Sequence, residues 1–234
     1  MSVPLYEESI ALTDATAAAG VDFSLLGGGA IFLHCPQAIA DGPYRELADL
    51  DGITTRSSTA ALAEVLERRG YEPDGRFNAM HGERRMIFTG PRGKLDVFVD
   101  VFEMCHTIDL RDRVGIEPRT LPVADLLLTK LQIVELNEKD ARDAAALLRE
   151  HELGSGPGDH VDVDYLNGLV GSDWGLWRTL TGTLATLAEL EPDVADRAGE
   201  LREAFEAAPK SRGWKLRARV GERKRWYELP EEVG

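Results

Sequence analysis

Two aspartates separated by a single leucine, Asp49 and Asp51, constrain the fold of this chain more than any other feature. Successive side chains of an extended strand point to opposite faces, so both carboxylates would lie on one face and Leu50 on the other. Their Cα atoms would then lie roughly 6 to 7 Å apart. That spacing suits a pair of divalent ions about 3.5 to 4 Å apart, the arrangement that serves phosphoryl transfer. The motif therefore predicts a strand that presents two carboxylates to a metal site.

A run of glycines precedes this strand. Gly27, Gly28 and Gly29 follow the apolar segment 23–26, a predicted strand, and lead into a predicted helix that begins at 30–34. Free backbone N–H groups at the start of a helix attract phosphate. A glycine triplet also commonly does no more than make a tight turn, and an Asp-x-Asp pair is common at a solvated strand edge. The position of the turn between strand and helix favours a phosphate cradle.

A third acid lies on a later strand, predicted at 94–102. Alternation places Asp96, Phe98 and Asp100 on one face of that strand. Acids that face inward from a central strand are costly unless they meet a metal or a partner. We expect Asp96 to join the acids of the first strand. In the alternative interpretation, Asp100 ends the strand or pairs with arginine, and the same holds for Asp96.

Charged residues on two predicted helices have two interpretations each. Lys130 is a lone cation in an apolar segment of a helix at 121–135, where it would extend to solvent or reach a triphosphate. Asp140 and Asp143 lie one turn apart on a helix at 137–150. They would belong to the site, or would form a helix start that Asn137 caps, with an ion pair.

The other reactive side chains form no recognisable site. The histidines are scattered, without the spacing of zinc ligands. Cys105 and His106 are neighbours in the sequence, so their side chains would point apart. We therefore exclude a zinc site and a cysteine hydrolase. Arg84 and Arg85 would either face a substrate pocket or lie on an exposed edge strand.

Taken together, the motifs resemble those of the DNA polymerase β-type nucleotidyltransferase superfamily, above all its small bacterial antibiotic and abortive-infection members. The family pattern is a hydrophobic strand, Gly-Gly-x-Ala, Arg-x-Thr-x-Asp-(Ile/Leu)-Asp, a third Asp on a later strand, then Lys-Leu and Lys-Asp-x-x-Asp on helices. The matching segments are Gly27-Gly28-Gly29-Ala30, Arg45-Glu46-Leu47-Ala48-Asp49-Leu50-Asp51, Asp96, Lys130-Leu131 and Lys139-Asp140-Ala141-Arg142-Asp143. The order holds over about residues 20–150. Leu47 replaces the usual threonine, and the gap between the glycines and the aspartates is longer than is common.

The resemblance implies an Mg²⁺-dependent nucleotidyltransferase that moves a nucleoside monophosphate from an NTP, expected to be ATP, to an acceptor hydroxyl of a small molecule or RNA. The residues that it implies for catalysis and metal binding are Asp49, Asp51 and Asp96. The residues that it implies for binding the triphosphate are Gly27, Gly28, Arg45 and Lys130. The alternative is a non-catalytic protein of this fold that binds a nucleotide or a protein partner, as in a toxin–antitoxin-like pair.

Charge restricts where a polyanion can bind. The net charge is −14, which repels nucleic acid from most of the surface. The stretch 210–225 is basic, with Glu222 as its one acid, so any contact with RNA should be local to it. A solvated hairpin is the alternative interpretation of that stretch.

Composition indicates a protein of the cytoplasm. No apolar run is long enough to span a membrane, and the N-terminus has no basic region before an apolar stretch, so we expect neither a membrane segment nor a signal peptide. The two cysteines, Cys35 and Cys105, lie in segments expected to be buried. A disulfide framework is therefore not expected, and a reducing compartment fits.

The predicted fold is α/β (α+β): a small mixed, twisted sheet flanked by helices, followed by a mostly helical C-terminal region. A nucleotidyltransferase-like domain is expected over 1–152 and the helical region over 153–234, with the glycine-rich segment 154–158 as linker or long loop. Further strands are predicted at 76–81 and 84–89. Ser58 is expected to cap a helix over 59–69, and alternation at 214–229 predicts a terminal β-hairpin.

Overall fold

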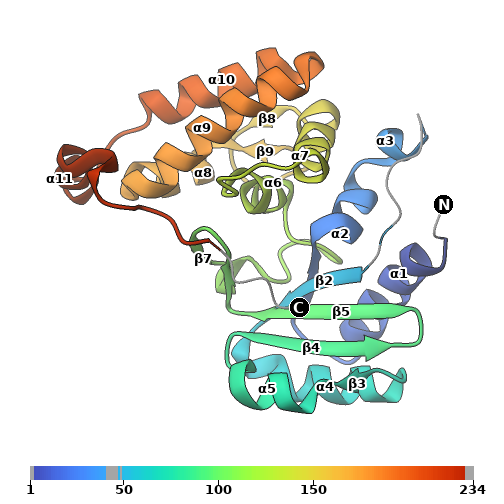
Figure 1. The fold of residues 1–234 in the computed structure, drawn as a ribbon. Helices are drawn as coiled ribbons and strands as arrows, with labels where there is room; N and C mark the ends of the chain where they lie inside the picture. Colours follow the sequence, from blue (N-terminus) through green and yellow to red (C-terminus); the bar gives the residue numbers. More distant parts are fainter. Residues whose placement is uncertain (1–2, 41–46, 48, 230–234) are drawn as a thin grey trace. The chain divides into compact units, whose positions relative to one another are not determined.

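The computed structural model describes residues 3–40, 47 and 49–229 (Figure 1). The chain forms two compact units. The first unit takes in residues 1–102 and 108–122, and the second takes in residues 103–107 and 123–234. The chain therefore changes unit near residue 122, about thirty residues before the predicted boundary at 152, and the glycine-rich segment 154–158 is a loop inside the second unit.

A mixed sheet with helices against it makes up the first unit. The strands are β1 (Phe23–Leu26), β2 (Asp49–Thr54), β3 (Glu72–Pro73), β4 (Arg85–Gly90), β5 (Gly93–Val99), and the short β6 (Val101–Glu103) and β7 (Thr107–Asp109). The order is β1-β2-β5-β4-β3, and β6 pairs with β5 and with β7. The helices are α1 (Val3–Ala18), α2 (Gly27–His34), α3 (Pro36–Ala40), α4 (Thr59–Arg68) and α5 (Gly75–His81), with 3₁₀ turns at Arg56–Ser58 and Arg111–Arg113.

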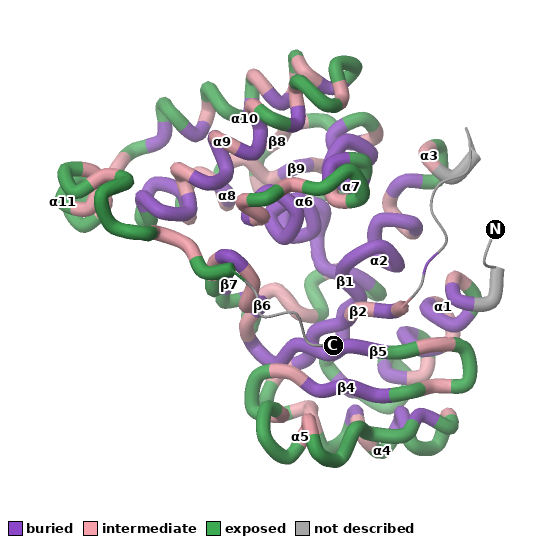
Figure 2. Tube along the Cα trace, in the orientation of Figure 1, coloured by how far each residue is buried: buried purple, intermediate pink, exposed green. Residues whose placement is uncertain are grey.

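The centre of this sheet is the pair β2 and β5, which run parallel, whereas β1 with β2 and β4 with β5 are antiparallel. These strands are apolar where they are buried, and Figure 2 shows them as the buried core of the unit. Leu50, Ile53, Leu95 and Val97 are at most 1% exposed. The acids of β2 and β5 are thus positioned by strands whose other side chains are in the core.

Helices make up nearly all of the second unit. They are α6 (Val123–Leu131), α7 (Glu138–Glu150), α8 (Val163–Ser172), α9 (Trp174–Leu190), α10 (Ala195–Ala207) and α11 (Arg212–Val220). The other elements are the parallel pair β8 (Leu153–Gly154) and β9 (Val161–Asp162), with 3₁₀ turns at Pro192–Val194 and Gly221–Arg223. The predicted α/β class, with a mixed sheet flanked by helices and a mostly helical C-terminal region, is confirmed.

Two predicted β segments are helical. The predicted strand 76–81 is α5, because Asp74 caps it by accepting a hydrogen bond from the Phe77 N–H. The predicted hairpin at 214–229 is also wrong: α11 occupies its first half, and the described residues beyond it form no strand. Ser211 caps α11 by accepting from the Trp214 N–H, and a cap outweighs a short alternation that a helix fits equally well.

The predicted cap of α4 is wrong as well. Ser58 lies in the 3₁₀ turn before the helix, and its hydroxyl donates to Asp22 instead of accepting from the helix. The predicted cap of α7 is confirmed, since Asn137 accepts from the Asp140 N–H at 2.9 Å.

The predicted strand 94–102 breaks at Asp100. That residue has φ +62°, so β5 ends at Val99 and Asp100 does not share the face of Asp96. The Asp100 carboxylate accepts from the Arg56 N–H at 2.9 Å and lies 3.6 Å from the Arg111 Nε. The alternative interpretation, that Asp100 ends the strand and pairs with arginine, is therefore the correct one.

Two further observations concern the cysteines and the length of the helices. Cys35 and Cys105 are both buried, as expected. Among residues 3–40, 47 and 49–229, none of the helices has the length and apolar character needed to cross a bilayer.

Candidate active site

Three carboxylates lie on one face of the central strand pair. In the parallel register of β2 and β5, Asp51 lies directly opposite Asp96. Asp49 is two residues before Asp51 on the same strand and so lies on the same face. Adjacent strands are about 4.8 Å apart and alternate residues of one strand about 6.6 Å apart. The sheet thus brings the three predicted acids together, with Asp96 buried and the other two half-buried.

Gly27 lies in contact with this acidic face. It directly follows β1, which pairs with β2 so that Leu26 lies opposite Asp51. Gly27 has φ +63°, and a Cβ at this position would lie 2.3 Å from the Asp51 Oδ2. The positive φ favours glycine, and a side chain here would displace the Asp51 carboxylate. The start of α2, where backbone N–H groups lack helical partners, is placed beside the carboxylate.

Asp96 already has a cationic partner. Arg85 on β4 donates to both carboxylate oxygens, from Nε to Oδ1 at 2.7 Å and from Nη2 to Oδ2. The guanidinium also lies over the ring of Phe98, 5.2 Å from its centroid. The hydrogen bond to Asp96 raises the pKa of Arg85 above its ordinary value; burial opposes this, and the charges of Asp96 and Asp51 add to it. Arg85 is therefore the counter-charge of the acidic face.

The sequence interpretation left the position of Arg85 open, and the turn between β4 and β5 decides it. Gly90 pairs with Gly93 across a two-residue turn, which places Ile87 opposite Asp96 and Arg85 opposite Phe98. Arg85 is thus the diagonal neighbour of Asp96 on the same face. β3 pairs with β4 only at Phe88 and Thr89, so at Arg85 the strand that pairs with β4 is β5. Arg85 is half-buried there, with its guanidinium turned to Asp96.

Lys94 is a residue of the acidic face that the sequence analysis did not identify. It is exposed and lies opposite Asp49 in the register of β2 and β5. The signal that could have revealed it is the parallel pairing of residues 49–51 with residues 94–96. Once Asp51 lies opposite Asp96, Lys94 lies opposite Asp49.

The predicted phosphate ligands Arg45 and Lys130 are not brought to this face by any described contact. Arg45 lies outside the described residues. Lys130 belongs to the second unit, where its Nζ lies 2.8 Å from both Asp140 Oδ1 and Asp143 Oδ2. Burial opposes the charge on Lys130, but the charges and hydrogen bonds of the two aspartates outweigh it and raise its pKa. The ion pair expected at Asp140 and Asp143 is confirmed, with Lys130 as its cation. Lys130 is buried and does not extend to solvent, and its contact with phosphate stays a prediction.

The arrangement suits a hard divalent cation. Mg²⁺ prefers carboxylate oxygens, and the acidic face offers three carboxylates without a thiolate or imidazole among them. A carboxylate has about four lone-pair sites, so Asp96 can accept Arg85 through two and retain others. The residues therefore fit a metal, although the guanidinium charge beside them opposes its binding.

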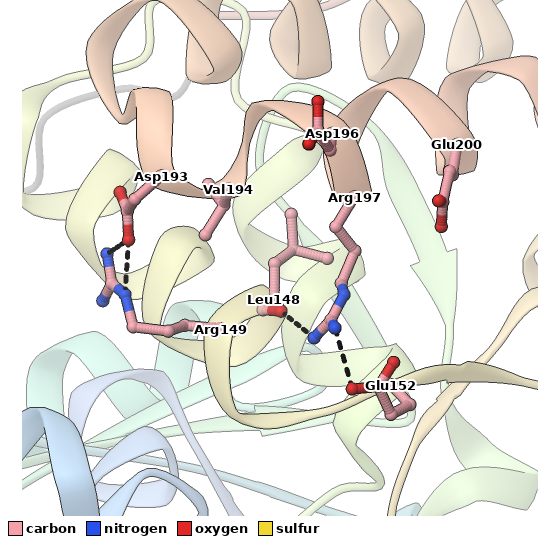
Figure 3. Close-up of a pocket in the computed structure, with 8 residues that line it drawn as sticks. All are labelled: Leu148, Arg149, Glu152, Asp193, Val194, Asp196, Arg197 and Glu200. Carbon is pink, nitrogen blue, oxygen red and sulfur yellow. Dashed lines mark hydrogen bonds and ion pairs between the residues drawn. The ribbon is translucent and has the colours of Figure 1, made fainter.

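A separate hollow of about 290 Å³ in the second unit contains none of these residues (Figure 3). It is lined by Leu148, Arg149, Glu152, Asp193, Val194, Asp196, Arg197 and Glu200. Arg149 donates to Asp193 at 2.7 Å and thereby lowers the pKa of that carboxyl, while Arg197 donates to the Leu148 carbonyl and to Glu152. Both arginines are thus engaged by neighbours, and we assign this hollow no ligand.

Comparison with known proteins yields similar structures only. No family model and no curated protein sequence matches the chain. The antibiotic-resistance nucleotidyltransferase ANT(2'')-Ia is 12% identical in sequence, with a TM-score of 0.43. The alignment covers 94% of this chain and 98% of that protein's chain. An antigenic nucleotidyltransferase-like protein from Paracoccidioides brasiliensis is 16% identical, with a TM-score of 0.43. That alignment covers 88% of this chain and 94% of the other. At these identities and TM-scores the similarity assigns no role to any residue of this chain.

Replacing Gly27 should disturb the acidic face specifically. Gly27→Ala incurs the strain of a positive φ, about 1 kcal/mol, plus the clash with Asp51. Gly20→Ala is a matched control, because Gly20 has φ +66° but open space around a Cβ. Urea unfolding should show Gly27→Ala to be less stable than Gly20→Ala by about 1 kcal/mol or more. Equal losses would mean that Asp51 does not pack on Gly27.

Removing the charge of Lys130 should strongly destabilise the protein. Lys130→Met leaves Asp140 and Asp143 without their shared cation, at a cost of about 3 kcal/mol near pH 7. Because the pKa of Lys130 is raised by folding, its contribution is complete below about pH 10.5 and is lost as pH rises through the higher folded value. Chemical unfolding across pH should show this, while the exposed Lys139→Met stays within about 0.5 kcal/mol of wild type. Similar stability for the two variants would contradict the assignment.

Proposed function

We propose that this protein is an Mg²⁺-dependent nucleotidyltransferase that transfers a nucleoside monophosphate from an NTP to an acceptor hydroxyl. The observation that carries the proposal is the convergence of Asp51, Asp96 and Gly27: two carboxylates opposed across parallel strands, beside a glycine that opens a helix. Carboxylates on a rigid sheet next to free backbone N–H groups are what a triphosphate and its counter-ions require.

The reaction forms one phosphorus–oxygen bond and breaks another. The acceptor hydroxyl oxygen attacks the α-phosphorus, the bond from that phosphorus to the β-bridging oxygen breaks, and pyrophosphate leaves. The hydroxyl proton passes to a base, and we assign this role to the Asp96 carboxylate. Arg85 bonds both oxygens of Asp96, so the proton would pass to one of the lone pairs that Arg85 leaves open.

The remaining roles follow from position. Asp49, Asp51 and Asp96 would hold Mg²⁺, which when bound neutralises phosphate charge and polarises the phosphorus. Backbone N–H groups of Gly27 and Gly28, at the start of α2, would donate to the β- and γ-phosphates. Lys94, exposed opposite Asp49, is placed to meet phosphate on this face.

The second candidate is a non-catalytic protein of this fold that binds a nucleotide or a protein partner. The bidentate pair of Arg85 with Asp96 favours it, because a cation already satisfies the buried acid. This candidate predicts Mg²⁺ affinity no better than millimolar and nucleotide binding that does not depend on metal. Titration of the wild type with Mn²⁺, with and without NTP, separates the two candidates.

Neutralising the acids of β2 should abolish metal-dependent nucleotide binding. Asp51→Asn and Asp49→Asn keep the shape of the side chain but remove a metal ligand, so the affinity for labelled ATP with Mg²⁺ should fall by more than about tenfold, which is about 1.4 kcal/mol. Asp112→Asn, an exposed change in the same unit, serves as the control and should bind as wild type does. Retained binding in both strand variants would refute the site.

Removing Arg85 should weaken the free protein and tighten the metal site. Arg85→Met leaves the buried Asp96 without its partner, so in EDTA the variant should lose about 2 kcal/mol of stability, allowing for the partial exposure of Arg85. Mn²⁺ should bind about tenfold more tightly than to wild type and restore most of that stability. Arg76→Met, at an exposed position, is the control. Unchanged Mn²⁺ affinity would show that Arg85 does not oppose a cation at this face.

A further inference from the structure

The outer face of α11 carries cationic side chains that are exposed. At 100° per residue, Arg212, Lys215 and Arg219 lie on one side of this nine-residue helix. All three are exposed, and within the described part of the chain their side chains make no hydrogen bond or ion pair. Figure 2 shows the helix as predominantly exposed. The charges on this face are therefore not needed for folding.

The opposite face of α11 is fixed to the second unit by aromatic contacts. The ring of Trp214 packs edge-on against Trp177, 5.2 Å between centroids. Arg217 lies over Trp174, 4.5 Å from the ring centroid, and also donates to the Gly221 and Lys224 carbonyls. Rigid anchoring on one side holds the outer cations in a fixed row, which lowers the entropic cost of binding a ligand.

The charge of this region is opposite to that of the rest of the protein. Residues 210–225 contain eight lysines and arginines and one glutamate, a charge of +7, so the rest of the chain carries −21. Glu222, the one acid, is paired with Arg178 at 2.6 Å. After the helix, Arg223, Lys224 and Arg225 continue the exposed cationic surface.

We propose that the outer face of α11, with residues 223–225, binds the phosphodiester backbone of a nucleic-acid strand. Arginine suits phosphate because its planar guanidinium donates two parallel hydrogen bonds. Arg212 to Arg219 spans about 10 Å along the helix axis, so the row can meet more than one phosphate of a strand. The proposal does not rest on the acids of β2 and β5.

A thin strand fits this surface better than an anionic bilayer does. A strand can follow the cationic face alone, whereas a planar membrane would also approach the acidic side chains of the second unit. Salt screens their charges only beyond about 8 Å. The exposed apolar side chains of this face are Leu216 and Val220, 61% and 41% exposed. Two such side chains bury too little apolar surface for stable membrane anchoring.

The test is fluorescence anisotropy of the full chain with a labelled 16-nucleotide RNA and the DNA of the same sequence, at several salt concentrations. Wild type should bind at least one of them with a dissociation constant of about 10⁻⁵ M or tighter. The triple variant Arg212→Gln, Lys215→Gln, Arg219→Gln should bind at least about tenfold more weakly, and the slope of log affinity against log salt should fall by about 2.

A matched triple variant controls for net charge. Arg68→Gln, Arg76→Gln and Arg202→Gln remove the same charge at exposed positions elsewhere and should bind as wild type does. Absence of strand binding, equal weakening in both triple variants, or binding to phosphatidylserine vesicles in place of the oligonucleotides would overturn the proposal. Asp51→Asn should leave strand binding unchanged, so this proposal and the catalytic one can fail separately.

Discussion

The parallel pairing of β2 with β5 is the constraint on which the site depends. It fixes Asp51 opposite Asp96, and a shift of one residue in this register would send one aspartate to the other face of the sheet. The pairing is itself fixed by the apolar neighbours of these acids in the sequence. Leu50 and Leu95 are buried on the other face of the sheet. The same alternation that builds the core therefore gathers the carboxylates.

Gathering like charges is unfavourable unless something offsets it. In this protein the offset is Arg85, which bonds Asp96 through both oxygens and lies over Phe98. The pair has two consequences that oppose each other. It stabilises the acidic face without metal, and its positive charge makes the face a weaker cation site. Whether the protein acts as an enzyme depends on how readily a divalent ion displaces that guanidinium.

Much of this arrangement follows from the sequence, because strong local patterns decide it. Alternation around Asp49 and Asp51 predicted β2, and the glycine run predicted the junction of β1 with α2. The partner of Asp96 was left open because it depends on the hairpin register, which the turn at residues 90–93 determines. Short alternating segments misled where a capping side chain decided the structure, as with Asp74 before α5 and Ser211 before α11. The backbone of Asp100, with its positive φ, carries no signal in the sequence.

The most direct measurement is anomalous diffraction from crystals soaked with Mn²⁺ and a non-hydrolysable NTP. The account predicts a manganese peak about 2.1 Å from carboxylate oxygens of Asp49 and Asp51, with an oxygen of Asp96 released from Arg85 and facing the ion. Nucleotide bound elsewhere, or no peak at this face with Arg85 still holding both oxygens of Asp96, would contradict it.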